Sequence, residues 1–203
     1  MLIKDNVENT IVIQKSEFIT RLFRVNNIDE VNQILIDIRK KHYDAKHNCY
    51  AYILGENQEI QKASDDGEPQ KTAGFPMLDV LKKNNLTNIL AITTRYFGGV
   101  LLGSGGLIRA YSSSVSEALK KASFCDMKLQ AKFCLTISYT AYNTLLKVFN
   151  YITIIDTSFQ SDIILTLAMD KDKVDEFKKD LYKYNINGEA LTYIEDTKVL
   201  VDC

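Results

Sequence analysis

Residues 95–111 read RYFGGVLLGSGGLIRAY, and the fold can be worked out from this glycine stretch. It holds five of the nine glycines in a chain of 203 residues. Before it lies Asn88–Phe97, a run whose centre is apolar on both faces, as expected for a strand inside a sheet. After it, apolar residues recur at helical spacing from Leu107 to Ala122. The stretch therefore predicts a strand, a glycine-rich turn and a helix in succession.

Two interpretations of the glycine-rich turn remain open. Glycine permits positive φ angles and close backbone approach, and a glycine turn before a helix presents N–H groups to an anion. Arg95 and Arg109 frame the stretch and would add positive charge. The alternative is a tight turn with no ligand. The spacing is not that of a P-loop, and it fits GxGxxG only if Ile108 replaces the last glycine.

A second polar motif, SDDGEPQKTAGFP, spans Ser64–Pro76 and contains both prolines of the chain. Asp65, Asp66 and Glu68 surround Gly67, and carboxylates grouped in this way can bind a hard cation such as Mg²⁺. The spacing is not that of an EF-hand, and aspartates also begin turns by bonding their own backbone. A metal site and an ordered turn are therefore the two alternatives for this motif.

Periodicity predicts an α+β protein. The first domain is expected to contain these strands and helices: Thr10–Gln14 and Glu17–Val25 as a hairpin, a helix capped near Asn27, strands His47–Leu54 and Glu59–Ala63, and a helix over Met77–Lys83 with Pro76 at its first position.

The second domain is expected from the alternation that begins near Lys132. Its predicted elements are a strand through Tyr139, a helix Tyr142–Phe149, strands Ile152–Thr157 and Asp162–Met169, a helix Val174–Tyr184 and a strand Glu189–Glu195. The order β-α-β-β-α-β is the ferredoxin-like pattern. We expect a boundary in Asp126–Gln130, which gives domains 1–127 and 128–203.

Composition excludes several classes of protein. The net charge of −1 leaves room only for a local nucleic-acid patch, not for a basic domain. Four dispersed cysteines and two histidines leave few zinc constellations. The start of the chain lacks a signal-peptide core, and no apolar run approaches the ~20 residues that span a bilayer. We expect a reduced, cytoplasmic protein with no cofactor and no membrane contact.

Nucleophilic catalysis and RNA stacking are weaker possibilities. Cys49 lies two residues from His47, but no GxSxG elbow is present and a nucleophile needs a base and an orienting group. Arginine next to aromatic residues, as in Arg95-Tyr96-Phe97, can hold single-stranded nucleic acid, although aromatics at strand ends more often belong to a core.

Four segments together resemble the YigZ/Impact family. They are KSEFI (Lys15–Ile19), AKHNCYAYILG (Ala45–Gly55), the Ser64–Pro76 motif and the glycine stretch, in this order. The resemblance implies a first domain of the ribosomal-protein-five domain-two-like superfold and a second resembling the last domain of elongation factor G. For the eukaryotic Impact relatives it implies regulation of translation under amino-acid stress through protein contacts.

The resemblance also implies a ligand-binding surface made by the two motifs. The residues that carry over are Asp65, Asp66, Gly67, Glu68, Pro69, Thr72, Arg95, Tyr96, Phe97, Gly98, Gly99, Gly103, Gly105, Gly106 and Arg109. Two departures stand out, because the family usually has Ser-Gly where this chain has Gln70-Lys71 and a lysine where it has Leu101. Lys71 would restore the lost charge if the two segments meet.

We therefore expect a binding protein and not an enzyme, with the two motifs as opposite walls of one cleft. The expected partner is RNA, the ribosome, a translation-associated protein or a phosphate-bearing ligand, in translation or a stress response. The alternative is a metal-dependent hydrolase or phosphate-ester enzyme that uses Asp65, Asp66 and Glu68.

Overall fold

The computed structural model describes residues 1–186 and 191–202, and its architecture is mixed α/β. Two compact units result from the contacts within the chain: a first unit, Met1–Asp126 with Asp202, and a second unit, Met127–Val201. The division lies one residue before the boundary expected from the sequence. The described residues form two β-sheets and five α-helices.

An antiparallel sheet of five strands forms the centre of the first unit. Its strands, in spatial order, are β2 (Val7–Ile13), β3 (Ser16–Arg24), β6 (Ile89–Tyr96), β4 (His47–Leu54) and β5 (Ile60–Ser64). Gln14 and Lys15 both have positive φ and join β2 to β3, as in the type I′ turns of two-residue hairpins. All of β6 except Tyr96 is buried, which includes the apolar centre expected from the sequence and also Thr93, Thr94 and Arg95.

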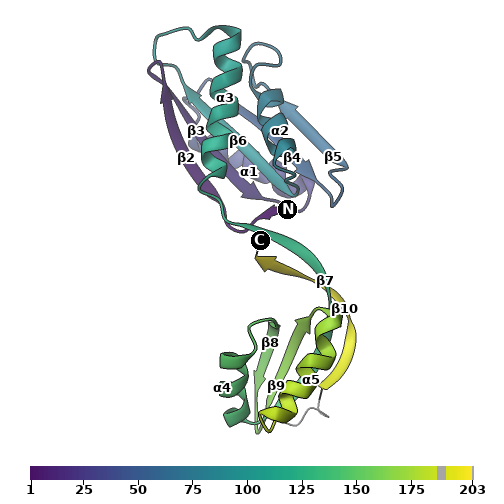
Figure 1. Ribbon diagram of the computed structural model, residues 1–203. Coiled ribbons are helices and arrows are strands. Elements are labelled where there is room, and N and C mark those ends of the chain that lie inside the picture. The colour runs from purple at the N-terminus through teal and green to yellow at the C-terminus, as the bar shows by residue number, and fades with distance from the viewer. Residues whose placement is uncertain (187–190, 203) are drawn as a thin grey trace. The chain divides into compact units, whose positions relative to one another are not determined.

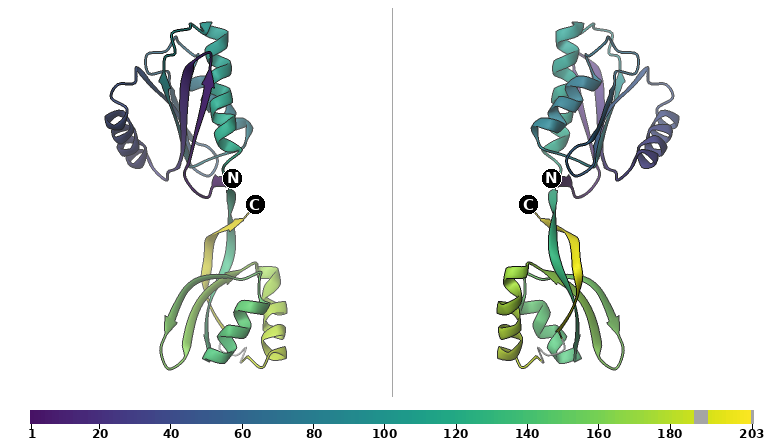
Figure 2. Two further views of the ribbon diagram at one scale, coloured as in Figure 1. Left: turned by 90° about the vertical axis from the view of Figure 1, so that its left-hand side faces the viewer. Right: turned by 90° about the vertical axis from the view of Figure 1, so that its right-hand side faces the viewer.

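Helices cover both faces of this sheet (Figure 1). Helix α1 (Ile28–Lys41) lies on one face, and α2 (Gly74–Lys83) and α3 (Gly103–Leu119) lie on the other, as Figure 2 shows. The Asn27 side chain accepts a hydrogen bond from the Glu30 amide, so the predicted N-cap of α1 is present. Helix α1 packs through its buried residues Val31, Leu35 and Ile38.

Two helices begin earlier than the sequence suggests. Helix α3 starts at Gly103, so Gly103, Gly105 and Gly106 form its first turn and are not a separate loop. Helix α2 starts at Gly74 and not at Met77. Pro76 is tolerated there because the first four N–H groups of a helix have no intrahelical acceptor.

The second unit shows the order β-α-β-β-α-β. Its elements are β7 (Phe124–Ile137), α4 (Tyr139–Val148), β8 (Thr153–Phe159), β9 (Ile163–Met169), the 3₁₀ turn η1 (Lys171–Lys173), α5 (Val174–Lys183) and β10 (Leu191–Asp202). The strands lie in the order β10-β7-β9-β8, and both helices pack on one face of the sheet through Leu145, Phe149, Phe177 and Leu181.

Strand β7 differs most from the sequence-based expectation. It runs without a break through Asp126–Gln130, where the sequence suggested a connecting segment. Its first residues, Phe124 and Cys125, pair with β1 (Leu2–Ile3), and its later residues pair with β9. Tyr139 begins α4 and is not part of the strand. The first two residues of the predicted last strand, 189 and 190, lie outside the described residues.

Among the described residues, no helix combines the length and the apolar sequence that a membrane span requires.

Candidate functional site

The Asp65–Pro69 turn and the glycine stretch border one cleft in the first unit. Its volume is about 770 Å³, within the roughly 300–1,000 Å³ typical of ligand pockets. The lining residues are Asp44, Lys46, His47, Gly67, Glu68, Pro69, Arg95, Tyr96, Phe97, Leu101, Leu102, Gly103, Ser104 and Leu107. The two motifs, far apart in sequence, therefore meet at one cavity.

Pairing of β4 with β6 positions the two residues that form the floor of the cleft, His47 and Arg95. The register sets His47 opposite Arg95, so the start of one strand lies beside the end of the other. The turn packs over this point, because His47 Nδ1 lies 2.9 Å from the Asp66 carbonyl oxygen. The Asn48 amide donates to the Asp66 carboxylate at 2.7 Å. These two contacts with Asp66 fix the position of the turn relative to the sheet.

Asp65 fixes the chain that follows the turn. Its carboxylate accepts hydrogen bonds from the amides of Lys71 (2.7 Å), Ala73 (3.0 Å) and Gly74 (2.9 Å). Ala73, the N-cap residue of α2, offers no side-chain cap, so Asp65 satisfies amides that the start of the helix leaves free. This carboxylate has an internal structural role.

Glu68 is the centre of a buried polar cluster. Its carboxylate accepts a hydrogen bond from Arg95 Nη1 at 2.7 Å and another from the Tyr111 hydroxyl at 2.8 Å. The Arg95 and Glu68 side chains are only 7% and 3% exposed. Burial raises the pKa of the Tyr111 hydroxyl and also that of the nearby Cys49 thiol. Both groups therefore stay neutral, and Cys49 lacks the thiolate character of a nucleophile.

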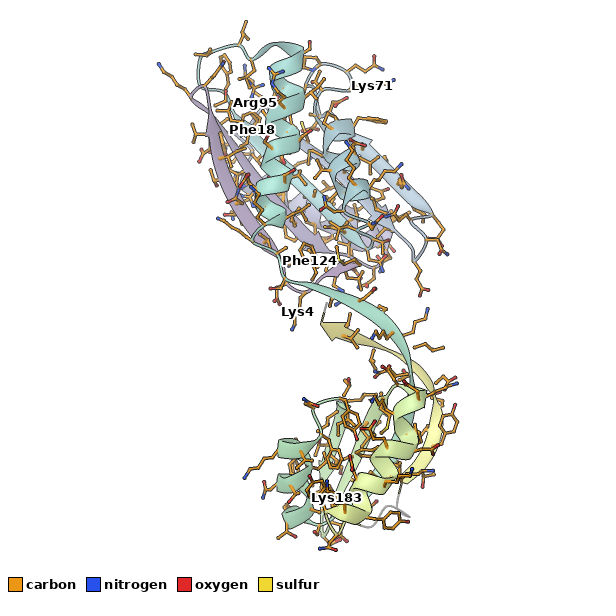
Figure 3. The ribbon with its side chains drawn as sticks, in the orientation of Figure 1. Lys4, Phe18, Lys71, Arg95, Phe124 and Lys183 are labelled. Atoms are coloured by element: carbon orange, nitrogen blue, oxygen red, sulfur yellow. The ribbon has the colours of Figure 1, made fainter. Side chains whose placement is uncertain are left out.

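The contacts of Arg95 are with other side chains of the protein and stabilise the fold. Its guanidinium carbon lies 5.5 Å from the centre of the Phe18 ring and 5.6 Å from that of the Phe97 ring. Figure 3 shows Arg95 and Phe18 close together beside α3. The charge of Arg95 is neutralised by Glu68 and enclosed by aromatic rings, a favourable cation–π arrangement. Arg95 lines the cleft without offering it an unpaired charge.

The structure requires glycine at several positions of the stretch, for a different reason at each. A Cβ atom at Gly98 would lie 2.0 Å from the Lys15 carbonyl, so this position permits close contact with the β2–β3 hairpin. Gly99 and Gly103 have φ values of +85° and +69°, in the left-handed region that favours glycine. Gly105 lies in the first turn of α3, and Arg109 reaches back to within 3.6 Å of its Cβ position.

Seven of the fifteen residues expected at the site line the cleft: Gly67, Glu68, Pro69, Arg95, Tyr96, Phe97 and Gly103. The other eight are Asp65, Asp66, Thr72, Gly98, Gly99, Gly105, Gly106 and Arg109, which lie in the same two segments but outside the lining. Thr72 is buried, and its hydroxyl donates to the Pro69 carbonyl at 2.6 Å. Arg109 is exposed on α3.

Seven lining residues were not expected at the site: Asp44, Lys46, His47, Leu101, Leu102, Ser104 and Leu107. The strand signal at His47–Leu54 was visible in the sequence, but its pairing with β6 was not. Leu101, where the family resemblance led us to expect a lysine, lines the cleft and is 86% exposed. Lys71 is exposed and outside the lining, and Figure 3 shows it reaching outward, away from Arg95.

The hypothesis of a metal-dependent hydrolase gains no support from this geometry. Asp65 is held by three amides, Asp66 is paired with Arg39 at 3.1 Å, and Glu68 is paired with Arg95. Within residues 1–186 and 191–202, no group of three histidine, cysteine, aspartate or glutamate side chains is placed to hold a metal ion.

A series of hydrogen-bonded polar side chains leads to the cleft from the face of the sheet that α1 covers. Arg21 donates to His42 Nε2 at 2.8 Å, which leaves the proton of the neutral ring on Nδ1. His42 Nδ1 lies 2.9 Å from the Tyr96 hydroxyl, and Tyr96 donates to Asp44 at 3.1 Å. Burial and the nearby Arg21 charge lower the pKa of His42. Asp44 and Tyr96 on the cleft wall are thus oriented by a neutral histidine.

We expect this histidine to make the fold less stable in mild acid. The unfolded chain protonates His42 near pH 6.5, whereas the native ring resists protonation. The free energy of unfolding should therefore fall as the pH drops through about 6.5, and the fall should end below the pKa of the folded state. Urea unfolding at about pH 7.5 and 5.5 measures the difference. His42→Gln should show a smaller fall, and an equal fall in both proteins would contradict the expectation.

Comparison with known proteins places the chain in a family. The model of the Impact N-terminal domain matches residues 14–119. IMPACT family member YigZ from Escherichia coli is 34% identical over 91% of this chain and 92% of its own length. IMPACT family member YvyE from Bacillus subtilis is 51% identical over 68% of this chain, but the match spans only 64% of YvyE.

A solved structure is similar along nearly the whole chain. It is the crystal structure of a hypothetical protein, with 30% sequence identity and a TM-score of 0.59, and the match covers 96% of this chain and 95% of that one. The family model spans the strands and helices that build the cleft, and the YigZ match extends through the second unit. The chain belongs to the IMPACT family.

Proposed function

We propose that this chain is a cytoplasmic regulatory protein, linked to translation, that binds its partner in the cleft and catalyses no reaction. One observation carries the proposal: the two family motifs enclose a cavity of about 770 Å³, while the carboxylates of the turn are bound to internal partners. The two motifs thus form the walls of a cavity, and the residues at the rim of this cavity are exposed to solvent.

The chemistry of the lining favours recognition over catalysis. A general acid or base must exchange a proton with the substrate, but Glu68 is held by Arg95 and Tyr111 in a buried cluster. Cys49 is fully buried and does not line the cleft, and its thiol lies 3.0 Å from the Asp65 carbonyl oxygen. In contrast, Phe97 and Leu101 are 53% and 86% exposed at the rim. Exposed apolar patches of this kind are typical of interaction sites.

The fold of each unit gives weaker, analogical support. We infer that the second unit is a ferredoxin-like domain, because its strand order β10-β7-β9-β8 follows from a β-α-β-β-α-β chain. Its likeness to the last domain of elongation factor G, and that of the first unit to the ribosomal-protein-five superfold, come from the family resemblance. These analogies suggest the ribosome or an associated factor as the partner.

Co-sedimentation with ribosomes tests the proposal. We expect the full chain to pellet with ribosomes from Bacillus subtilis, the source of the relative YvyE. Phe97→Ser and Leu101→Ser should each weaken the association about tenfold or more, because full burial of a leucine or phenylalanine side chain under a partner is worth about 1.5–3 kcal/mol. Phe75 (58% exposed) and Val12 (66% exposed) lie on the same unit outside the cleft. Phe75→Ser and Val12→Ser are therefore matched controls and should pellet like the unmodified chain.

Two results would overturn the proposal. The first is that the unmodified chain stays in the supernatant at low salt. The second is that the cleft variants and the matched controls pellet equally well. Circular dichroism of each variant checks that the fold is kept, which we expect because all four side chains are largely exposed.

A further inference from the structure

The α1–β4 connection, residues 43–46, follows His42 at the end of α1 and supplies Asp44 and Lys46 to the lining of the cleft. We propose that His42 is a pH-sensitive switch: the neutral ring holds this connection against the sheet, and protonation of the ring releases it. The inference goes beyond the proposed function and does not rest on it, because it concerns the shape of the cleft wall and not the identity of the partner.

The direction of each hydrogen bond between Arg21 and Asp44 is fixed by chemistry. Arginine only donates, so His42 Nε2 accepts from Arg21 Nη2 at 2.8 Å and the proton of the neutral ring is on Nδ1. The Tyr96 hydroxyl gives its proton to the Asp44 carboxylate at 3.1 Å, so it accepts the hydrogen bond from His42 Nδ1 at 2.9 Å. Donation thus runs from Arg21 through the ring and Tyr96 to Asp44, and only a neutral ring completes it.

A protonated ring does not fit this arrangement. Both of its nitrogens are donors, so the N–H groups of His42 Nε2 and Arg21 Nη2 would face each other at 2.8 Å, with a positive charge on each side. Arg21 is held on its other side, because its Nε is paired with Glu8 and its Nη1 donates to the Thr94 hydroxyl at 3.2 Å. The Arg21 side chain is also only 6% exposed. His42 is therefore the group that must move.

The charged and titratable groups around His42 come from both sides of the pair that it bridges. They are Glu8 of β2, Arg21 of β3, Lys41 of α1, Tyr96 of β6 and Asp44 of the connection. Burial and the positive charges of Arg21 and Lys41 lower the pKa of His42, whereas the carboxylates of Asp44 and Glu8 favour the charged ring. The Tyr96 hydroxyl stays neutral, because burial raises its pKa. The switch therefore operates in mild acid, below the ordinary histidine pKa of about 6.5.

Asp44 is the carboxylate that can receive the charged ring. Glu8 is already paired with Arg21, whereas Asp44 is exposed and is tied to the sheet by the hydrogen bond from Tyr96. We expect the ring to leave Arg21 and to pair with Asp44, which ends the bond from Tyr96. The connection then loses this tie to β6, and the part of the cleft lining that it forms changes shape.

Nuclear magnetic resonance of the full chain tests the proposal. The chain has two histidines, so His42→Gln identifies the imidazole signal of His42. Between about pH 7.5 and about pH 5, the backbone order parameters of residues 43–46 should fall from about 0.85, typical of a rigid backbone, to below about 0.6. The midpoint of this fall should coincide with that of the His42 signal. His42→Gln cannot take up this proton, and its order parameters should stay constant.

Asp44→Asn is a second variant, at an exposed position. It removes a carboxylate that favours the charged ring, so the midpoint of the His42 signal should move to lower pH, and an unchanged midpoint would contradict the role given to Asp44. Constant order parameters at a pH where the His42 signal shows a protonated ring would overturn the inference. A fall that persists in His42→Gln, a fall whose midpoint follows His47, or unfolding of the first unit before His42 is protonated would overturn it as well.

Discussion

Glu68→Ala should lower the free energy of unfolding by about 3–5 kcal/mol, because it leaves the buried Arg95 charge without its partner. The Tyr111 hydroxyl loses its acceptor in the same variant. A domain is usually stable by only about 5–15 kcal/mol, so this is a large share of the total. Urea denaturation followed by circular dichroism measures the change.

Two further variants separate the effect of the unpaired Arg95 charge from the effect of losing an ion-pair contact. Replacing both members of the pair, as in Glu68→Leu with Arg95→Met, removes the unpaired charge and should recover a large part of the loss. Asp79→Ala removes an exposed ion pair with Lys83 and should change stability by less than about 1 kcal/mol. A Glu68→Ala protein no less stable than Asp79→Ala would show that the cluster around Glu68 does not hold the motifs together.

Gly98→Ala should destabilise the first unit by about 2–3 kcal/mol, because the added methyl group meets main-chain atoms and not a flexible side chain. Its Cβ would lie 2.0 Å from the Lys15 carbonyl carbon and oxygen and 2.5 Å from the Ser16 nitrogen. The hairpin or the cleft loop must move, and the hydrogen bond from the Gly98 amide to the Ser16 hydroxyl (3.2 Å) would weaken.

Neighbouring glycines provide the comparison for this variant. Gly99→Ala meets no atom within 4 Å but keeps a φ of +85°, which costs about 1–2 kcal/mol for a residue with a side chain. The methyl group of Gly105→Ala would make an ordinary van der Waals contact with Arg109 Nη1 at 3.6 Å within a helix, so this variant should stabilise the protein by about 0.5–1 kcal/mol. A Gly98→Ala protein as stable as the unmodified chain would contradict the close approach of Gly98 to the hairpin.

The local elements could be predicted from the sequence because their signals are local. Alternating or continuous apolar runs indicated β3, β4 and β6, and the capping residue Asn27 indicated the start of α1. The start of α3 at Gly103 could not be predicted in the same way, because glycine disfavours a helix in isolation. Packing of Leu107 and Tyr111 against the sheet outweighs that preference.

The composition of the cleft depended on pairing between distant strands. Nothing near His47 in the sequence shows that it lies opposite Arg95, so Asp44 and Lys46 were not expected on the lining. Arg95 looked like a ligand-binding charge because its pairing with Glu68 spans 27 positions of sequence. Long-range contacts of this kind turned an expected anion site into an apolar cleft with a neutralised floor.

The unbroken course of β7 has the same origin. A strand that changes partners can continue through a unit boundary, because backbone hydrogen bonds to β1 at one end and β9 at the other keep its main chain extended. Polar residues such as Lys128 weakened the apolar alternation there and suggested a linker. Lysine is only depleted in strands and its effect there depends on context, so Lys128 does not exclude a strand.

We propose that this protein binds its partner in translation in the cleft between the Asp65–Pro69 turn and the glycine stretch. The most direct measurement is the dissociation constant for ribosomes of Leu101→Ser compared with Val12→Ser, each in the full chain. We expect a dissociation constant about tenfold or more larger for Leu101→Ser and an unchanged value for Val12→Ser. Equal dissociation constants for the two variants, or no ribosome binding by the unmodified chain, would contradict it.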